Sequence, residues 1–202
     1  MTHTHSDHLN GMGEFHVRRP SPTLVYHGNH PITLRNIEYF RYLEWENVLS
    51  FQTFETGETL FVGKTIKVTP IEVNHEFPCH GFIVETEKHK IGIITDTNYI
   101  LPERTKEAIE DCDILFVDGF SENYEQLKKL YEEIGEPFPE PIEDIWGHMT
   151  LPQASFLALE SRSKLAVALH ISHYTSPHDT LVQNFETESF KIAYDGMELE
   201  LP

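Results

Sequence analysis

Apolar and polar positions alternate along the middle of the chain in a way that predicts several short strands. Residues 65–73 (TIKVTPIEV) and 81–86 (GFIVET) read as strands, and 90–95 (KIGIIT) follows across a polar turn, which predicts a hairpin. The runs at 113–119 (DILFVDG) and 164–170 (KLAVALH) are typical of buried strands. Because helical segments separate these strands and no repeat or low-complexity linker is present, we predict a single α/β domain over residues 1–202.

Two of the separating segments carry helix signals. Residues 122–135 (ENYEQLKKLYEEIG) end on a glycine, which is a common helix stop. Residues 150–161 open with Thr150 and Gln153, which are spaced as a capping box. Both segments are therefore predicted to be helices.

Two further stretches are rich in turn-forming residues. The Pro-rich tract GEPFPEPIEDIWG (135–147) is predicted to be a loop. The closing stretch FKIAYDGMELEL (190–201) holds an Asp-Gly pair between apolar positions, which predicts a hairpin at the end of the chain.

Composition narrows the function. The chain has 202 residues, 39% of them hydrophobic, and 33 acidic against 15 basic residues, giving a net charge of -18. This charge repels polyanions, so nucleic acid is not an expected partner. The only two cysteines, Cys79 and Cys112, form no disulfide framework, and no segment resembles a signal peptide or a membrane span. We therefore predict a cytoplasmic protein that does not enter a membrane.

Several potential metal ligands occupy strand ends. His75, Asp96, Asp118 and His170 each lie at or just after the end of a predicted strand, where the side chains of open α/β sheets gather into a crevice. The chain also begins with the hexapeptide HTHSDH, in which extended backbone would place the first two histidines on one side. Histidine and aspartate without cysteine suit zinc, manganese or iron. The alternative is a solvated His-rich tail or a tag remnant, which would leave the later residues unexplained.

The HTHSDH stretch resembles the HxHxDH signature of the metallo-β-lactamase superfamily, and the later His, Asp and His follow in the superfamily's order. Within it, NHEFPCHGF, WGHMTLPQA, LHISHY and AYDGMELEL resemble the phosphoribosyl 1,2-cyclic phosphate phosphodiesterases. The resemblance runs from Met1 to the end of the chain. It implies an αββα four-layer sandwich that binds two divalent transition-metal ions, zinc or manganese, between its sheets.

The resemblance also implies a role for each residue of the centre. One ion would be held by His3, His5 and His75, and the other by Asp7, His8 and His170, with Asp96 bridging. The ions would activate a bridging hydroxide. In the GHMT segment, His148 would bind phosphate or protonate the leaving oxygen, and Asp7 would assist proton transfer. The alternative for His148 is a loop residue beside the Thr150 cap.

Three further residues are left outside this ligand set. Asp118 is expected to form a turn or to support a ligand, and His80 and His173 to lie near the site without holding an ion.

Superfamily members also carry strands before HxHxDH, whereas only Met1 and Thr2 precede His3. We thus expect an N-terminally incomplete sandwich whose first strands are missing. Its open sheet edge could pair two copies as a homodimer.

These observations predict a dinuclear metal-dependent phosphodiesterase for small phosphate esters, cyclic ones included. One alternative is a superfamily hydrolase of a thioester or lactone, in which the GHMT histidine has no obvious task. Another is an inactive, truncated remnant that serves as an interaction module. Metal content and turnover of a simple phosphodiester separate the three.

Overall fold

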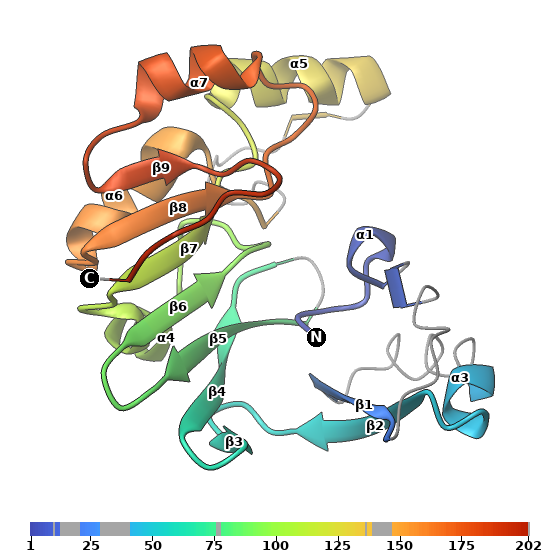
Figure 1. Cartoon of the computed structure of the whole chain (residues 1–202). Coiled ribbons are helices and arrows are strands. Elements are labelled where there is room, and N and C mark those ends of the chain that lie inside the picture. The colour runs from blue at the N-terminus through green and yellow to red at the C-terminus, as the bar shows by residue number, and fades with distance from the viewer. Residues whose placement is uncertain are drawn as a thin grey trace.

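The structure is built around a seven-stranded mixed sheet (Figure 1). A computed structural model describes residues 1–9, 11–12, 21–28, 41–75, 78–135, 137–138 and 147–201. The seven strands lie side by side in chain order: β3 (Leu60–Val62), β4 (Ile66–Val73), β5 (Cys79–Glu85), β6 (Lys90–Ile94), β7 (Ile114–Asp118), β8 (Leu165–Leu169) and β9 (Phe190–Ile192). Pairing is antiparallel from β3 to β6 and parallel from β6 to β9.

A second, two-stranded sheet and the helices complete the layers. Strands β1 (Thr23–Gly28) and β2 (Leu49–Phe54) pair in parallel. The described helices are α1 (Ser6–Leu9), α3 (Arg41–Trp45), α4 (Glu103–Ile109), α5 (Tyr124–Ile134), α6 (Leu151–Glu160) and α7 (His178–Phe185). Helix α4 packs on β4, α6 on β7 and β8, α7 on β9, and α3 on β2. The predicted α/β fold is confirmed, and no helix among the described residues is long and apolar enough to cross a membrane.

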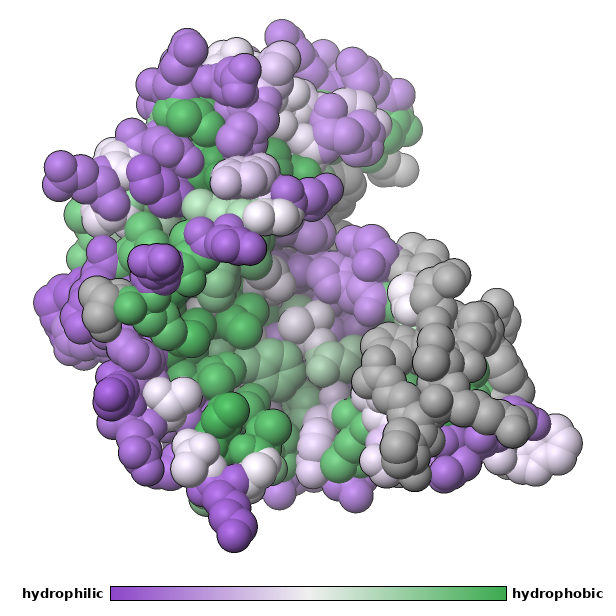
Figure 2. Space-filling view, viewed as in Figure 1, coloured by the Kyte–Doolittle hydropathy of each residue, from purple (hydrophilic) through white to green (hydrophobic). Residues whose placement is uncertain are grey.

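The main core lies between the large sheet and its helices, where residues such as Ile94, Leu115 and Leu151 are fully buried. On the strands, buried Ile83 and Ile94 alternate with half-buried Phe82 and Ile93. Figure 2 shows apolar surface at the hollow between the two sheets. The large sheet is thus more deeply covered on its helical face.

Most of the predicted elements are confirmed. The predicted strands are β4 to β8, and β5 and β6 form the predicted antiparallel hairpin. Helix α5 is capped by Asn123 and ends at Gly135, which is left-handed with a φ of 77°. Helix α6 has the complete capping box of Thr150 and Gln153. Of the predicted loop 135–147, residues 136 and 139–146 lie outside the described residues.

The predicted C-terminal hairpin is wrong. Strand β9 pairs in parallel with β8, and residues 193–201 contain a turn, in which Met197 N donates to Tyr194 O, but no strand. The Asp-Gly pair does form a turn, with Gly196 at a φ of 85°. Because a local turn signal does not specify a pairing partner, the apolar stretch at 190–192 extends the parallel part of the sheet instead.

The close contact between β5 and β6 leaves no space for a side chain at Gly81. A Cβ on Gly81 would lie 2.6 Å from the carbonyl oxygen of Ile93, which is backbone and has no room to move. Gly81→Ala should therefore lower the free energy of unfolding by about 1–3 kcal/mol, as overpacked sites do. Gly11→Ala is the control, because its Cβ would meet nothing within 4 Å. Denaturant unfolding checks both variants, and equal stability of the two would contradict the packing described.

Candidate metal centre

The N-terminal segment lies between the two sheets and is bonded to both (Figure 1). The Met1 ammonium donates to Tyr26 O of β1 at 3.0 Å, and His80 N of β5 donates to Thr2 O at 3.1 Å. His8 N then donates to His5 O as the chain turns into α1. This path carries the HTHSDH side chains to the ends of the central strands.

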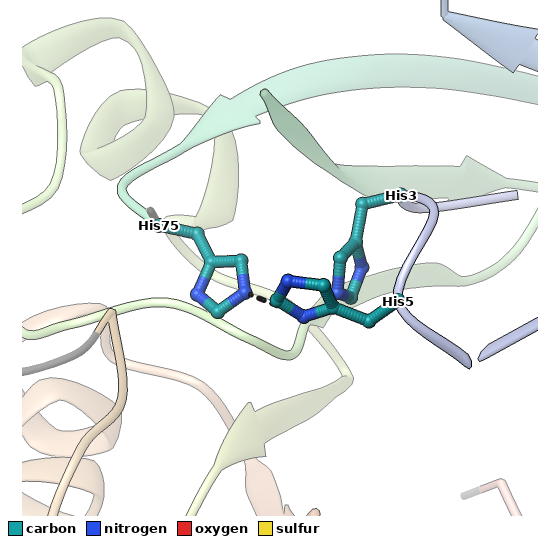
Figure 3. Close-up of side chains that lie close together, drawn as sticks. All are labelled: His3, His5 and His75. Atoms are coloured by element: carbon teal, nitrogen blue, oxygen red, sulfur yellow. Dashed lines mark hydrogen bonds between the residues drawn. The ribbon is translucent and has the colours of Figure 1, made fainter. Parts of the chain in front are cut away.

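The first group of candidate ligands is His3, His5 and His75. One ring nitrogen from each lies within 4.8 Å of the other two. The three rings converge from the N-terminal segment and from the end of β4, with Nδ1 of His5 and Nε2 of His75 3.3 Å apart (Figure 3). Nδ1 of His75 donates to Gly147 O at 3.2 Å, so its Nε2 offers a lone pair to the group.

The second group is Asp7, His8 and His170, whose ligand atoms also lie within 4.8 Å of one another. Oδ2 of Asp7 is 3.2 Å from Nε2 of His8 and 3.4 Å from Nε2 of His170. His170 follows β8 directly and has a positive φ of 58°, which is uncommon for a residue with a Cβ. All six residues predicted as terminal ligands are thus brought into two adjacent groups.

Asp96 lies between the two groups. Its Oδ1 is 3.3 Å from Nε2 of His8, 3.3 Å from Nε2 of His170 and 3.8 Å from Nε2 of His3. The residue is 1% exposed and takes a φ of 55° just after β6. Its carboxylate therefore faces both groups, as a bridging ligand must.

Several buried polar atoms of the centre need a partner that a metal ion would supply. Nε2 of His3, Nε2 of His8 and Oδ2 of Asp96 are buried without a hydrogen bond, which is costly unless another partner is present. Burial lowers the pKa of His3 to about 3 and keeps the ring neutral, the form that ligates. Although burial disfavours the charged carboxylate, the close Nε2 of His8, 3.3 Å from Oδ1, and the charges of His170 and His8 hold the pKa of Asp96 well below its usual range.

A second buried aspartate, Asp118 at the end of β7, organises the neighbourhood. Its Oδ2 accepts from Asp96 N and from Nδ1 of His148, both at 2.9 Å, and its Oδ1 accepts from Met149 N at 2.9 Å. The ring of Phe120 stacks on that of His148 with centroids 4.5 Å apart. Since Nδ1 of His148 carries the hydrogen given to Asp118, this contact fixes the tautomer of the ring. The predicted supporting role of Asp118 agrees with these contacts.

His148 lies beside both groups, with ring centroids 5.2 Å from His75 and 5.0 Å from His170. The other two histidines noted in the sequence are outside the described ligand groups. Nε2 of His80 is 3.0 Å from Oγ1 of Thr56, and the exposed His173 packs on Tyr174. Sequence reasoning missed Thr2 and Gly147, whose contacts with ligands depend on the fold, although both adjoin a motif histidine.

Comparison with known proteins agrees with this geometry. The profile of the Beta-lactamase superfamily domain matches residues 1–171, which include every candidate ligand. The chain belongs to the metallo-β-lactamase superfamily. The predicted superfamily is therefore confirmed, and with it the α/β architecture. No protein with a curated description matches the sequence.

Three solved structures are similar to the chain in fold. A new diphosphatase from the PhnP family has a TM-score of 0.74 at 21% identity, and the match covers 99% of this chain and 70% of the diphosphatase chain. The short form of human tRNase Z has a TM-score of 0.70 at 20% identity, and the match covers 100% of this chain and 78% of the tRNase Z chain. The metallo-β-lactamase fold protein YhfI from Bacillus subtilis has a TM-score of 0.70 at 18% identity, and the match covers 97% of this chain and 74% of the YhfI chain. At these identities the likeness establishes the fold.

The close approach of Gly147 to His75 gives a prediction. Gly147 has a φ of 60°, and a Cβ there would lie 2.3 Å from Nδ1 and 2.6 Å from Cα of His75. Gly147→Ala should displace the ring and weaken zinc binding by about 10- to 100-fold, the usual effect of losing a residue that orients a ligand. Gly135→Ala is the control, with a similar φ of 77° but open space. A zinc titration that gives the same affinity for both variants would contradict the assignment.

Proposed function

We propose that this superfamily member is a dinuclear metal-dependent phosphodiesterase. His3, His5 and His75 would hold one ion, Asp7, His8 and His170 the other, and Asp96 both. The observation that carries the proposal is the convergence of three imidazole Nε2 atoms on one buried Asp96 oxygen, at 3.3 to 3.8 Å. A donor set of imidazole and carboxylate without thiolate suits zinc or manganese.

Two divalent ions in this centre would lower the pKa of a shared water and offset charge on the phosphoryl oxygens. The chain's own residues do the rest. His148 protonates the leaving oxygen from Nε2, because Nδ1 is held by Asp118 and the buried carboxylate balances a positive charge on the ring. Asp7, whose side chain is 62% exposed, can pass a proton to solvent.

We infer a small phosphodiester as the substrate class, cyclic esters included. The superfamily neighbours named as a diphosphatase and as tRNase Z support phosphoester chemistry. The net charge of -18 favours a small anion, drawn in by local metal charge, over a long polyanion. The motif resemblance to phosphoribosyl 1,2-cyclic phosphate phosphodiesterases supports a sugar cyclic phosphate in particular.

We propose that residues 1–202 act as one domain in the cytoplasm, a location that the low cysteine content supports. A homodimer is supported by the outer edge of β2, beside which no further strand lies among the described residues. A thioester or lactone hydrolase would share the metal ligands, but it would give the pair formed by Asp118 and His148 no evident task.

Asp96→Ala tests the bridging assignment. Removing a carboxylate shared by both ions should abolish hydrolysis and remove most of the second ion. Asp113→Ala is the control, because Asp113 is also largely buried but bonds Lys90 N and Lys164 instead. Elemental analysis and turnover of bis(p-nitrophenyl) phosphate measure both effects. Full activity and metal content in Asp96→Ala would show that Asp96 does not bridge.

His148→Ala tests the proton donor. An alkoxide leaves poorly without a proton, whereas nitrophenolate leaves readily, so the variant should slow hydrolysis of a ribose cyclic phosphate by about 10²- to 10⁴-fold. Its effect on a nitrophenyl phosphodiester should be much smaller. His173→Ala, outside the described ligand groups, should change neither rate. Equal losses on both substrates, with metal content unchanged, would reduce His148 to a phosphate-binding residue.

A further inference from the structure

The hydroxyl of Thr2 lies between two candidate ligands that belong to different ions. Its Oγ1 is 3.1 Å from Nδ1 of His3 and 3.5 Å from Nδ1 of His8. His3 is a member of the first ligand group and His8 of the second. The two imidazole rings are also in contact, with centroids 4.3 Å apart. One side chain therefore contacts a member of each group.

The chemistry of imidazole gives this contact a direction. For Nε2 to offer its lone pair to an ion, Nδ1 must carry the hydrogen and donate it to an acceptor. A threonine hydroxyl has two lone pairs, so Oγ1 can accept from both rings at once. The two Nε2 atoms are buried without hydrogen bonds, and they lie 3.8 Å (His3) and 3.3 Å (His8) from Oδ1 of Asp96. Both rings thus turn the same nitrogen toward the bridging carboxylate.

The backbone of Thr2 is fixed from both sides. Thr2 O accepts from His80 N in β5, and the ammonium of the preceding residue, Met1, donates to Tyr26 O in β1. The hydroxyl is therefore anchored to the large sheet and to the small sheet. A movement of either ring would stretch a hydrogen bond to a fixed acceptor.

We propose that Thr2 is a positioning residue that holds His3 and His8 in the ligating tautomer and makes binding of the two ions interdependent. The proposal rests on the metal centre of the proposed function. It does not depend on which ester the enzyme cleaves, because Thr2 acts on ligands and not on substrate.

The test is zinc affinity, measured by chelator competition on the full chain. Thr2→Val removes the acceptor at nearly constant volume and should weaken both ions by about 10- to 100-fold, as is usual when the hydrogen-bond partner of a ligand is lost. Thr2→Ser keeps the hydroxyl and should bind close to wild type. Thr56→Val is a matched control, since it removes a threonine bonded to the buried His80. Its zinc affinity should be unchanged.

A second measurement distinguishes loss of the Thr2 hydroxyl from a change in packing caused by the valine side chain. In the metal-free protein, ¹⁵N NMR should show His3 protonated at Nδ1, and this preference should be lost in Thr2→Val and in Thr2→Ala. Circular dichroism and intact mass verify that each variant folds and retains Met1. Unchanged affinity, loss of only one ion, or equal loss in Thr2→Ser would each overturn the proposal. Wild-type chain that binds two ions but hydrolyses no phosphodiester would contradict the proposed function alone.

Discussion

The buried carboxylate of Asp96, just after β6, determines which groups must surround it. A charge as deeply buried as that of Asp96 is strongly unfavourable unless it is paired. Here one oxygen faces the Nε2 atoms of His3, His8 and His170, and the backbone N–H is bonded to Asp118. Positive charge is thus required at this point of the fold, and divalent ions held by the surrounding imidazoles would supply it.

The sheet brings these groups together because three neighbouring parallel strands end at one edge. Asp96 follows β6, Asp118 ends β7 and His170 follows β8. Asp96 and His170 both have positive φ values, 55° and 58°, so the backbone is held in a sparsely populated region where it presents the ligands. Strain of this kind is typical of functional sites and persists because the packed strands on either side fix it.

Much of the large sheet and of the candidate ligand set could be predicted from the sequence, because both leave local patterns in it. The two-residue period and the apolar runs located β4 to β8, and the HTHSDH stretch with the residues after the strands indicated every member of the two ligand groups. Local patterns do not record which distant residues meet. The contacts of Thr2 with His8, of Gly147 with His75 and of Asp118 with His148 depend on tertiary packing. For the same reason the turn at Gly196 was predictable, but the parallel pairing of β9 was not.

The proposed function requires that one chain hold two ions around Asp96. The most direct test is elemental analysis of the folded wild-type protein after removal of metal, reconstitution with zinc or manganese, and desalting. We expect two ions per chain. A folded, reconstituted protein that retains one ion or none would contradict it.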